Sequence, residues 1–182
     1  MTSVYRTGKQ YATEAKNEKY DKLKYSQCDC QSFVEKVLAD IGVRRADGQP
    51  YNWRGSNQIA RVACSWIGTK EEAISKFGEI PVGAWAFIWD DKGGEKERGY
   101  TDGLGDYKHI GIYVGDNIVR DSTKTSRRDG VGNSDISRYN KIGLCMYLDF
   151  DQTITYNKYE AIVNILSQMR NLLNELEGMV KE

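Results

Sequence analysis

The sequence has very little histidine and no long apolar segment. It contains one histidine, His109, among 182 residues, so any chemistry that depends on an imidazole has to use that side chain. No apolar run approaches the roughly 18 residues that a transmembrane helix requires, and we therefore expect no membrane span. Residues 1–20 lack the apolar core of a secretory signal peptide, so none is expected.

The chain also lacks an excess of one charge. It carries 26 Lys and Arg residues against 26 Asp and Glu residues, which gives a formal net charge of zero. Proteins that bind nucleic acid mainly through charge carry a basic excess, so no nucleic-acid partner is expected. Hydrophobic residues make up 40% of the chain and charged residues 29%, a balance typical of a globular protein.

The four cysteines do not form a recognisable metal motif. Cys28 and Cys30 are one residue apart, whereas Cys64 and Cys145 are isolated. Zinc sites in sequences usually show pairs of CxxC-like segments, so we expect no metal and no other cofactor. A chain of this length can build a core without disulfides, and we interpret Cys64 and Cys145 as small buried hydrophobic residues.

Residues 30–41 show the pattern of an amphipathic helix. Apolar residues recur there at spacings of three and four, namely Phe33, Val34, Val37, Leu38 and Ile41. Asp29 is a suitable N-cap and Gly42 a suitable C-terminal stop. A second helix is expected within residues 58–77.

Short apolar runs follow the second expected helix. They predict strands at residues 84–89, 109–114, 118–121 and 142–150. The middle two are expected to form a hairpin, because only residues 115–117 separate them. Residues 122–140 are polar and predict irregular structure. A helix followed by successive strands indicates an α+β fold with an antiparallel sheet.

The C-terminal segment differs in character from the rest. We expect one domain over residues 1–152 and a separate amphipathic helix over residues 153–182. Apolar residues from Ile162 to Val180 keep the three-and-four spacing for nearly three heptads. Two interpretations stay open: a coiled coil that forms a homo-oligomer, and a single helix that docks on the domain.

Cys30 and His109 are the candidate nucleophile and base. A helix N-terminus favours a thiolate over a thiol, and Cys30 falls in the first turn of the expected helix, whereas Cys28 precedes it. A cysteine nucleophile needs a base, and His109 is the one imidazole present. Each residue alone is a weak signal. A single histidine in a strand more often has no catalytic role, and a cysteine at the start of a helix is more often unreactive.

Four segments strengthen this pairing because they resemble, in order, motifs of the NlpC/P60 family of cell-wall cysteine peptidases. DCQSFV at residues 29–34 resembles D-C-S-G-[LF]-V, and RGSNQ at residues 54–58 is similar to R-x-S-x-x-Q. IPVGAWAFI at residues 80–88 resembles P-G-D-L-V-F-F. HIGIYVG at residues 109–115 resembles H-[VI]-G-I-Y-x-G and is the most specific match. Together they cover roughly residues 25–125.

The resemblance implies a fold and a reaction. The fold is a papain-like core in which the helix bearing Cys30 packs on an antiparallel sheet bearing His109. The reaction is hydrolysis of peptide bonds in peptidoglycan through an acyl-enzyme, with Cys30 as nucleophile and His109 as acid and base. Gln31 and Ser32 depart from the usual Ser-Gly, which alters the pocket beside the nucleophile.

Motif alignment makes Asp121 the third catalytic residue. Its carboxylate would orient His109 through the Nδ1–H group and stabilise the imidazolium. A three-residue loop at residues 115–117 pairs Asp121 with Gly111, on the same face as His109. A two-residue turn would instead place Ser122 opposite His109 and turn Asp121 away.

Four further residues are candidates for substrate binding. By resemblance, Tyr25 assists backbone amides in holding an oxyanion, and Asp29 binds the free amine of a stem peptide, although its simpler role is to cap the helix. Arg54 belongs to the segment similar to R-x-S-x-x-Q. Tyr107 ends a glycine-rich loop that runs into His109, where it is a candidate wall of the substrate groove.

These features together favour a peptidoglycan hydrolase that cleaves stem or bridge peptides. The resemblance to lysin-type members implies a phage or prophage origin, synthesis in the cytoplasm, and action on the wall after holin-type release or as part of a phage particle. One alternative is an N-acetylmuramoyl-L-alanine amidase with the same dyad. Another is a non-catalytic binding or assembly module.

Overall fold

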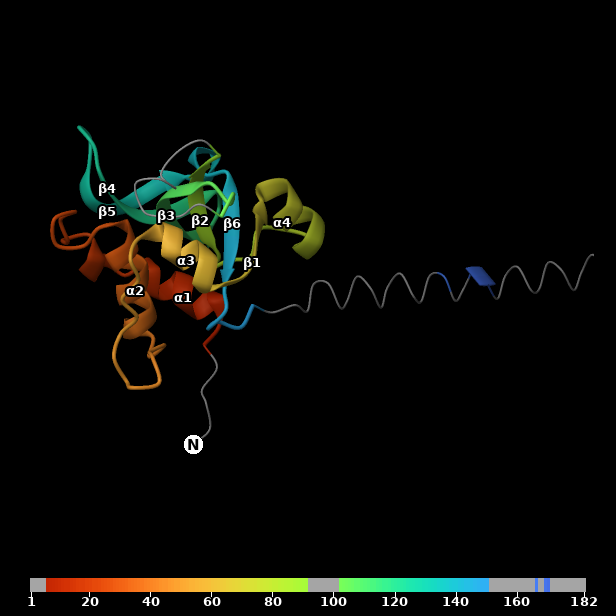
Figure 1. The fold of residues 1–182 in the computed structure, drawn as a ribbon, viewed down its shortest axis with the longest axis horizontal. Helices are drawn as coiled ribbons and strands as arrows, with labels where there is room; N and C mark the ends of the chain where they lie inside the picture. Colours follow the sequence, from red (N-terminus) through yellow and green to blue (C-terminus); the bar gives the residue numbers. More distant parts are fainter. Residues whose placement is uncertain (1–5, 92–101, 151–165, 167–168, 171–182) are drawn as a thin grey trace, which may run out of the picture.

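The computed structural model describes residues 6–91 and 102–150, together with Leu166, Met169 and Arg170. Figure 1 shows helices and strands in the order α1 (Gly8–Ala15), η1 (Glu18–Tyr20), α2 (Cys30–Asp40), α3 (Ser56–Val62), β1 (Cys64–Thr69), α4 (Lys70–Phe77), β2 (Trp85–Asp90), β3 (Asp106–Gly115), β4 (Ile118–Lys124), β5 (Asp129–Asp135), η2 (Ile136–Arg138) and β6 (Lys141–Cys145). The strands form one sheet with the order β1-β6-β2-β3-β4-β5. Neighbouring strands are antiparallel, so the predicted α+β class is confirmed.

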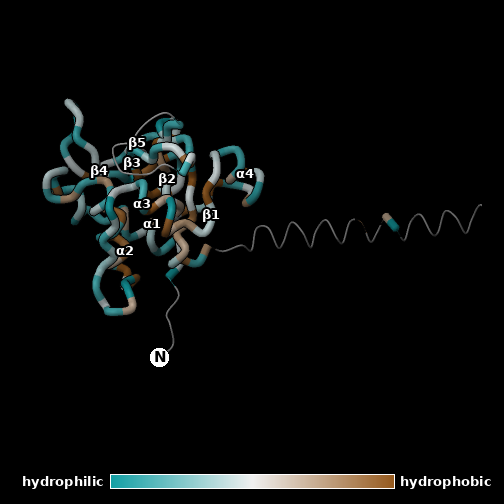
Figure 2. Tube along the Cα trace, viewed as in Figure 1, coloured by the Kyte–Doolittle hydropathy of each residue, from teal (hydrophilic) through white to brown (hydrophobic). Residues whose placement is uncertain are grey.

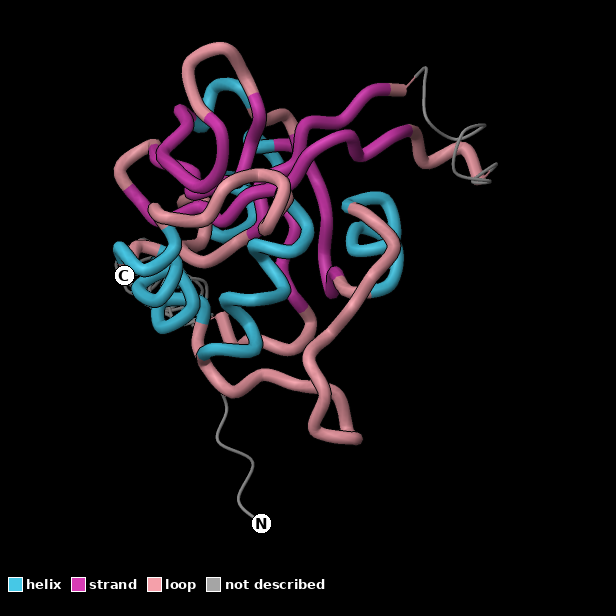
Figure 3. Tube along the Cα trace, turned by 90° about the vertical axis from the view of Figure 1, so that its left-hand side faces the viewer, coloured by secondary structure: helices cyan, strands magenta, loops and turns pink. Residues whose placement is uncertain are grey.

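The helices are distributed unevenly around the sheet. Helices α1, α2 and α3 pack on the central strand β3, and α2 also contacts β4. Helix α4 lies apart from them, beside β1 and β6 (Figure 1). Figure 3, in which the view is rotated by 90° from Figure 1, shows the twist of the strands across the molecule. The first turn of α2 therefore lies close to the strands that carry His109 and Asp121.

Helix α2 forms where the apolar pattern predicts it. The Asp29 side chain accepts a hydrogen bond from the Ser32 amide at 2.8 Å, and the backbone turns left-handed at Gly42 with φ of 84°. The apolar side of the helix is fully buried, with Phe33, Val34, Val37 and Leu38 at 0% exposure.

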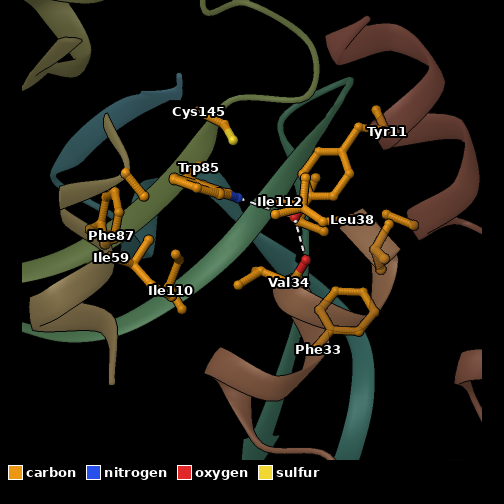
Figure 4. Close-up of a cluster of buried hydrophobic side chains, with 14 of the residues drawn as sticks. Tyr11, Phe33, Val34, Leu38, Ile59, Trp85, Phe87, Ile110, Ile112 and Cys145 are labelled. Atoms are coloured by element: carbon orange, nitrogen blue, oxygen red, sulfur yellow. Dashed lines mark hydrogen bonds between the residues drawn. The ribbon is translucent and has the colours of Figure 1, made fainter. Parts of the chain in front are cut away.

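Two apolar clusters lie on the two faces of the sheet. The larger one joins α1, α2 and α3 to β2 and β3, and Figure 4 shows its centre. Tyr11 links these layers, because its hydroxyl donates to the Val34 carbonyl at 2.9 Å and accepts from Trp85 Nε1 at 3.1 Å. The second cluster includes Tyr139, Val119 and residues of α4. Figure 2 shows hydrophobic stretches inside the fold and hydrophilic loops around it.

The helix predicted within residues 58–77 is present, but that range also contains a strand. The structure places strand β1 between two helices, α3 and α4, and the sequence analysis did not predict this strand. The segment CSWIGT has poor helix formers, and its backbone pairs with β6 at the other end of the chain. Helix α4 has a local signal, since Thr69 and Glu72 form a capping box.

The prediction of irregular structure over residues 122–140 was wrong. Strand β4 continues to Lys124, and β5 pairs with it along seven residues before the short helix η2. Strand β5 lies at the edge of the sheet, where polar side chains are tolerated because one side of the strand faces no partner. At the other end, β6 stops at Cys145, so the strand predicted over residues 142–150 is shorter than expected.

The β3–β4 hairpin has the register that brings Asp121 toward His109. Its turn contains two residues, Asp116 and Asn117, both with positive φ (52° and 60°). A bulge between Tyr113 and Gly115 supplies the extra residue that the expected three-residue loop would have contained. Ile112 therefore pairs with Arg120, and the same register sets Gly111 opposite Asp121.

The start of β5 packs against the segment that precedes the nucleophile, and this contact leads to a testable prediction. An added Cβ at Gly130 (φ 125°) would lie 2.0 Å from the Leu23 carbonyl oxygen, whereas Gly48 (φ 78°) has nothing within 4 Å. We expect Gly130→Ala to lower the free energy of unfolding by about 2–4 kcal/mol, and Gly48→Ala by about 1 kcal/mol. Urea denaturation measures both, and equal losses would show that the Leu23 contact is unimportant.

The predicted C-terminal helix falls almost wholly outside the described residues. Leu166, Met169 and Arg170 are helical, and the rest of residues 153–182 is not described. The coiled-coil and docking interpretations therefore both stay predictions, as does the domain boundary at residue 152. Within the described ranges, no helix is long and apolar enough to cross a membrane.

Candidate active site

His109 and Asp121 form the centre of the candidate site. The Nε2 atom of His109, on β3, lies 2.6 Å from Oδ2 of Asp121, on β4. Asp121 is completely buried and the His109 side chain is 14% exposed. The predicted pairing is confirmed, but the predicted ring atom is wrong: Asp121 binds Nε2 rather than Nδ1.

Cys30 lies near the other side of the imidazole. Its thiol, in the first turn of α2, is close enough to His109 to raise the pKa of the ring. With Nε2 bound to Asp121, Nδ1 is the nitrogen left for the thiol. Burial lowers the pKa of His109, but the hydrogen bonds and negative charges of Asp121 and Cys30 outweigh it and raise the pKa to about 9.

Gly111 provides the space that Asp121 occupies. Two residues beyond His109, it lies opposite Asp121, and an added Cβ would approach the Asp121 Cβ to 2.9 Å and a Val119 methyl group to 2.5 Å. A larger residue would therefore push β4 side chains away from the imidazole. This gives the glycine of the HIG segment a direct physical reason.

Ser122, the alternative third residue, has another role. Its hydroxyl donates to the Cys28 carbonyl, which lies two residues before the nucleophile. The Cys28 side chain is buried, and burial raises its pKa to about 11. A buried thiol with a raised pKa is a poor nucleophile, so the geometry favours Cys30 over Cys28.

The second oxygen of Asp121 has its own partners. Oδ1 accepts hydrogen bonds from Arg128 Nη2 at 2.5 Å and from Ser134 Oγ at 2.8 Å. Burial raises the pKa of Asp121, but the hydrogen bonds and positive charge of His109, Ser134 and Arg128 dominate and lower it. The sequence analysis missed Arg128 and Ser134, because polar residues in a segment predicted to be irregular carry no periodic signal.

Tyr25 and Asp29 lie beside the nucleophile. Burial raises the pKa of Tyr25, and the negative charges of Cys30 and Asp29 raise it further. The Tyr25 amide donates to the Asp129 carboxylate at 3.3 Å, so the start of β5 also touches this segment. Asp29 has the capping role that the sequence predicts, whereas its binding of a substrate amine stays a prediction.

Gln31 connects α2 to the loop that carries Arg54. Its side-chain oxygen accepts from the Gly55 amide at 2.5 Å, and its side-chain nitrogen donates to Glu35 at 2.9 Å and to the Trp53 carbonyl. Arg54 is exposed between these two anchored residues. The departure from the Ser-Gly pattern at Gln31 therefore anchors a neighbouring loop.

Tyr107 does not line a groove as expected. It is 6% exposed, and its ring packs edge-on against Phe87 with the centroids 5.2 Å apart. A bulge makes Lys108 an extra residue in β3, so Tyr107 turns to the face of Ile110 instead of that of His109. Residues 92–101 of the preceding loop lie outside the described residues.

The four cysteines are all free. Across the described part of the chain, no group of three or more His, Cys, Asp and Glu side chains could hold a metal ion. Cys30, His109 and Asp121 supply a thiol, an imidazole and a carboxylate, the groups that nucleophilic catalysis by cysteine uses.

Comparisons with known proteins give no match. No family model matches the chain, and neither a curated protein nor a solved structure does. The resemblance to NlpC/P60 peptidases therefore depends on the four sequence segments.

Proposed function

We propose that this protein is a cysteine peptidase of the NlpC/P60 type that cleaves stem or bridge peptides of peptidoglycan. One observation carries the proposal: Cys30, His109 and Asp121 come from three separate elements, Asp121 is hydrogen-bonded to the imidazole at 2.6 Å, and the thiol is close enough to raise the pKa of the same ring. Cys30 stands at a helix start, where backbone amides face outward. This combination is what nucleophilic acyl transfer requires.

The reaction follows from the positions of these groups. His109 takes the Cys30 thiol proton at Nδ1, and the sulfur attacks the peptide carbonyl carbon. Asp29 already occupies the Ser32 and Phe33 amides, which leaves those of Cys30 and Gln31, with Tyr25, to hold the oxyanion. The tetrahedral intermediate then collapses as the C–N bond breaks, and His109 donates its proton to the leaving amine.

Water completes the cycle in the second half-reaction. His109 removes a proton from a water molecule, and the resulting hydroxide attacks the thioester carbonyl. The carboxylic acid leaves and Cys30 is restored as His109 returns its proton to sulfur. The pKa of about 9 means that the surroundings of His109 stabilise the protonated ring, so the imidazolium that forms when the ring accepts a proton is favoured.

The finer fold and the setting are part of the same proposal. The packing of α2 on β3 and β4 supports a papain-like core. We propose peptidoglycan as the partner, and a phage or prophage lysin that reaches the wall by holin-type release or on a phage particle. The zero net charge of the chain indicates that contacts at the catalytic site or through the C-terminal segment, rather than overall charge, select the substrate.

Product analysis tests the reaction. We expect digestion of purified peptidoglycan to release new amino termini on stem or bridge residues other than L-alanine, because the dyad is proposed to cut within the peptide. New termini on L-alanine would identify an N-acetylmuramoyl-L-alanine amidase. Absence of any new terminus would contradict both and support a binding or assembly module. Mass spectrometry of the soluble fragments distinguishes the three outcomes.

A further inference from the structure

The β4–β5 hairpin, at the left of Figure 1, places an arginine on the side of Asp121 that faces away from His109. Arg128 stands in the turn that joins the two strands, and its guanidinium donates to Asp121 Oδ1 at 2.5 Å. Asp121 Oδ2 faces His109. The carboxylate is therefore held between a permanent cation and an imidazole that changes its charge during the proposed reaction.

Contacts within the β4–β5 hairpin fix the position of the Arg128 side chain. Thr125 Oγ accepts from the Arg128 amide at 3.1 Å, and Arg128 Nη1 donates to the Asn133 carbonyl at 2.7 Å. An added Cβ at Gly132 would lie 2.7 Å from Arg128 Cδ, so this glycine leaves room for the side chain. Only 21% of the Arg128 side chain is exposed. The guanidinium is thus held in place and does not simply extend into solvent.

The need for this cation follows from the charge changes of the cycle. When His109 has given its proton away, Asp121 would be a completely buried carboxylate beside a neutral ring. An unpaired buried carboxylate is unstable and tends to take up a proton. A protonated Asp121 would accept only a weaker hydrogen bond from Nε2–H, and a rotated one would accept none, so the orientation that points Nδ1 at Cys30 would be less well held.

We propose that Arg128 is a positioning residue that keeps Asp121 ionised and oriented in both protonation states of His109. The inference depends on the proposed function, since it assigns Arg128 a part in that reaction. Ser134 Oγ supports the same carboxylate oxygen and is itself bonded to Arg138 Nη1 at 2.9 Å. The ionisable groups around the imidazole are Cys30 on α2, Asp121 on β4 and Tyr139, whose ring centroid lies 6.1 Å from that of His109, with Arg128 behind Asp121.

Kinetics of three variants test the assignment. We expect Arg128→Met to lower kcat roughly 10- to 100-fold with KM within about twofold of the wild type, because a loosened catalytic group slows chemistry rather than binding. Arg128→Lys should restore part of kcat. Arg127→Met is the matched control, since Arg127 is an exposed neighbour in the same turn. Unchanged kcat in Arg128→Met would overturn the proposal.

The single histidine allows a second measurement that needs no substrate. The Nε2–H proton of His109 should give a downfield NMR signal in the wild type, in Arg127→Met and in Arg128→Lys, because it is bound to Asp121. Arg128→Met should lose this signal by exchange with water. A retained signal would overturn the positioning role, even if kcat fell. If the wild type hydrolyses nothing, the proposed function fails while this comparison still decides the role of Arg128.

A charge-neutral background covers the case in which Arg128→Met does not fold. Asp121→Asn removes the buried charge, so adding Arg128→Met to it leaves no uncompensated carboxylate. If Arg128 acts only through Asp121, the double variant should have the same kcat as Asp121→Asn alone. A further loss in kcat of tenfold or more would show that Arg128 acts by another route and would overturn the inference.

Discussion

Replacing Cys30 with alanine is expected to reduce kcat/KM for a stem-peptide substrate by at least about 10⁴-fold. The variant has no nucleophile, so no thioester can form, and only oxyanion stabilisation and substrate binding remain. The fold should be retained, because Cys30 is only partly buried and its helix is capped by Asp29. Single-turnover hydrolysis of a defined muropeptide, with mass spectrometry for the acyl-enzyme, is the appropriate measurement.

Cys28→Ala is the matched control for this loss. Cys28 is two residues away, and its thiol is buried with a raised pKa, so its removal should leave kcat/KM within a few-fold of the wild type. Loss of activity in Cys28→Ala with activity retained in Cys30→Ala would reassign the nucleophile. Hydrolysis that survives both changes would reject a cysteine mechanism.

Asp121→Asn is expected to lower kcat by about 10²- to 10⁴-fold with a smaller change in KM. Asparagine keeps the shape of the side chain but removes the anion that stabilises the His109 imidazolium. The amide can also present its NH₂ group to Nε2 and favour the wrong tautomer, with a proton on Nδ1 facing Cys30. Asp135→Asn, at an exposed carboxylate of β5, is a suitable control, and wild-type kcat in Asp121→Asn would contradict the role of Asp121.

The same variant should change the pH dependence in a defined direction. In the wild type the pKa of His109 is about 9, so the rate should fall as pH rises through that value and the ring loses the proton needed by the leaving amine. In Asp121→Asn, burial still lowers the pKa while the main opposing anion is gone. The alkaline limit should therefore move to lower pH. NMR titration of the His109 Cε1 proton measures the pKa directly, and an unchanged value would contradict the assignment.

The local parts of the fold and site could be predicted from the sequence. The apolar spacing of residues 30–41, with Asp29 and Gly42 at its ends, indicates helix α2, and a cap needs contacts only a few residues apart. The strand of His109 follows from its β-branched run. The register that sets Asp121 opposite Gly111 follows from a short turn, although a bulge supplies one of its residues.

Contacts between distant residues could not be predicted in this way. Strand β1 depends on pairing with β6, more than seventy residues later, and its own composition is ambiguous between helix and strand. Strand β5 is an edge strand of mostly polar residues, so its sequence resembles a loop. Tyr107 points into the core because a bulge at Lys108 moves its side chain to the opposite face of the sheet from His109. The residue types in this segment do not indicate that bulge.

The sequence alone determined that this protein has one imidazole, a cysteine at the start of a helix, and a carboxylate within reach of that imidazole across a short hairpin. Those are properties of residue types and near neighbours. Only the tertiary structure decided that Nε2 faces Asp121, that Nδ1 is left for Cys30, and that Arg128 holds the far oxygen of the carboxylate. Ring orientation and burial of charge depend on packing between separate elements, which periodicity in a single segment does not record.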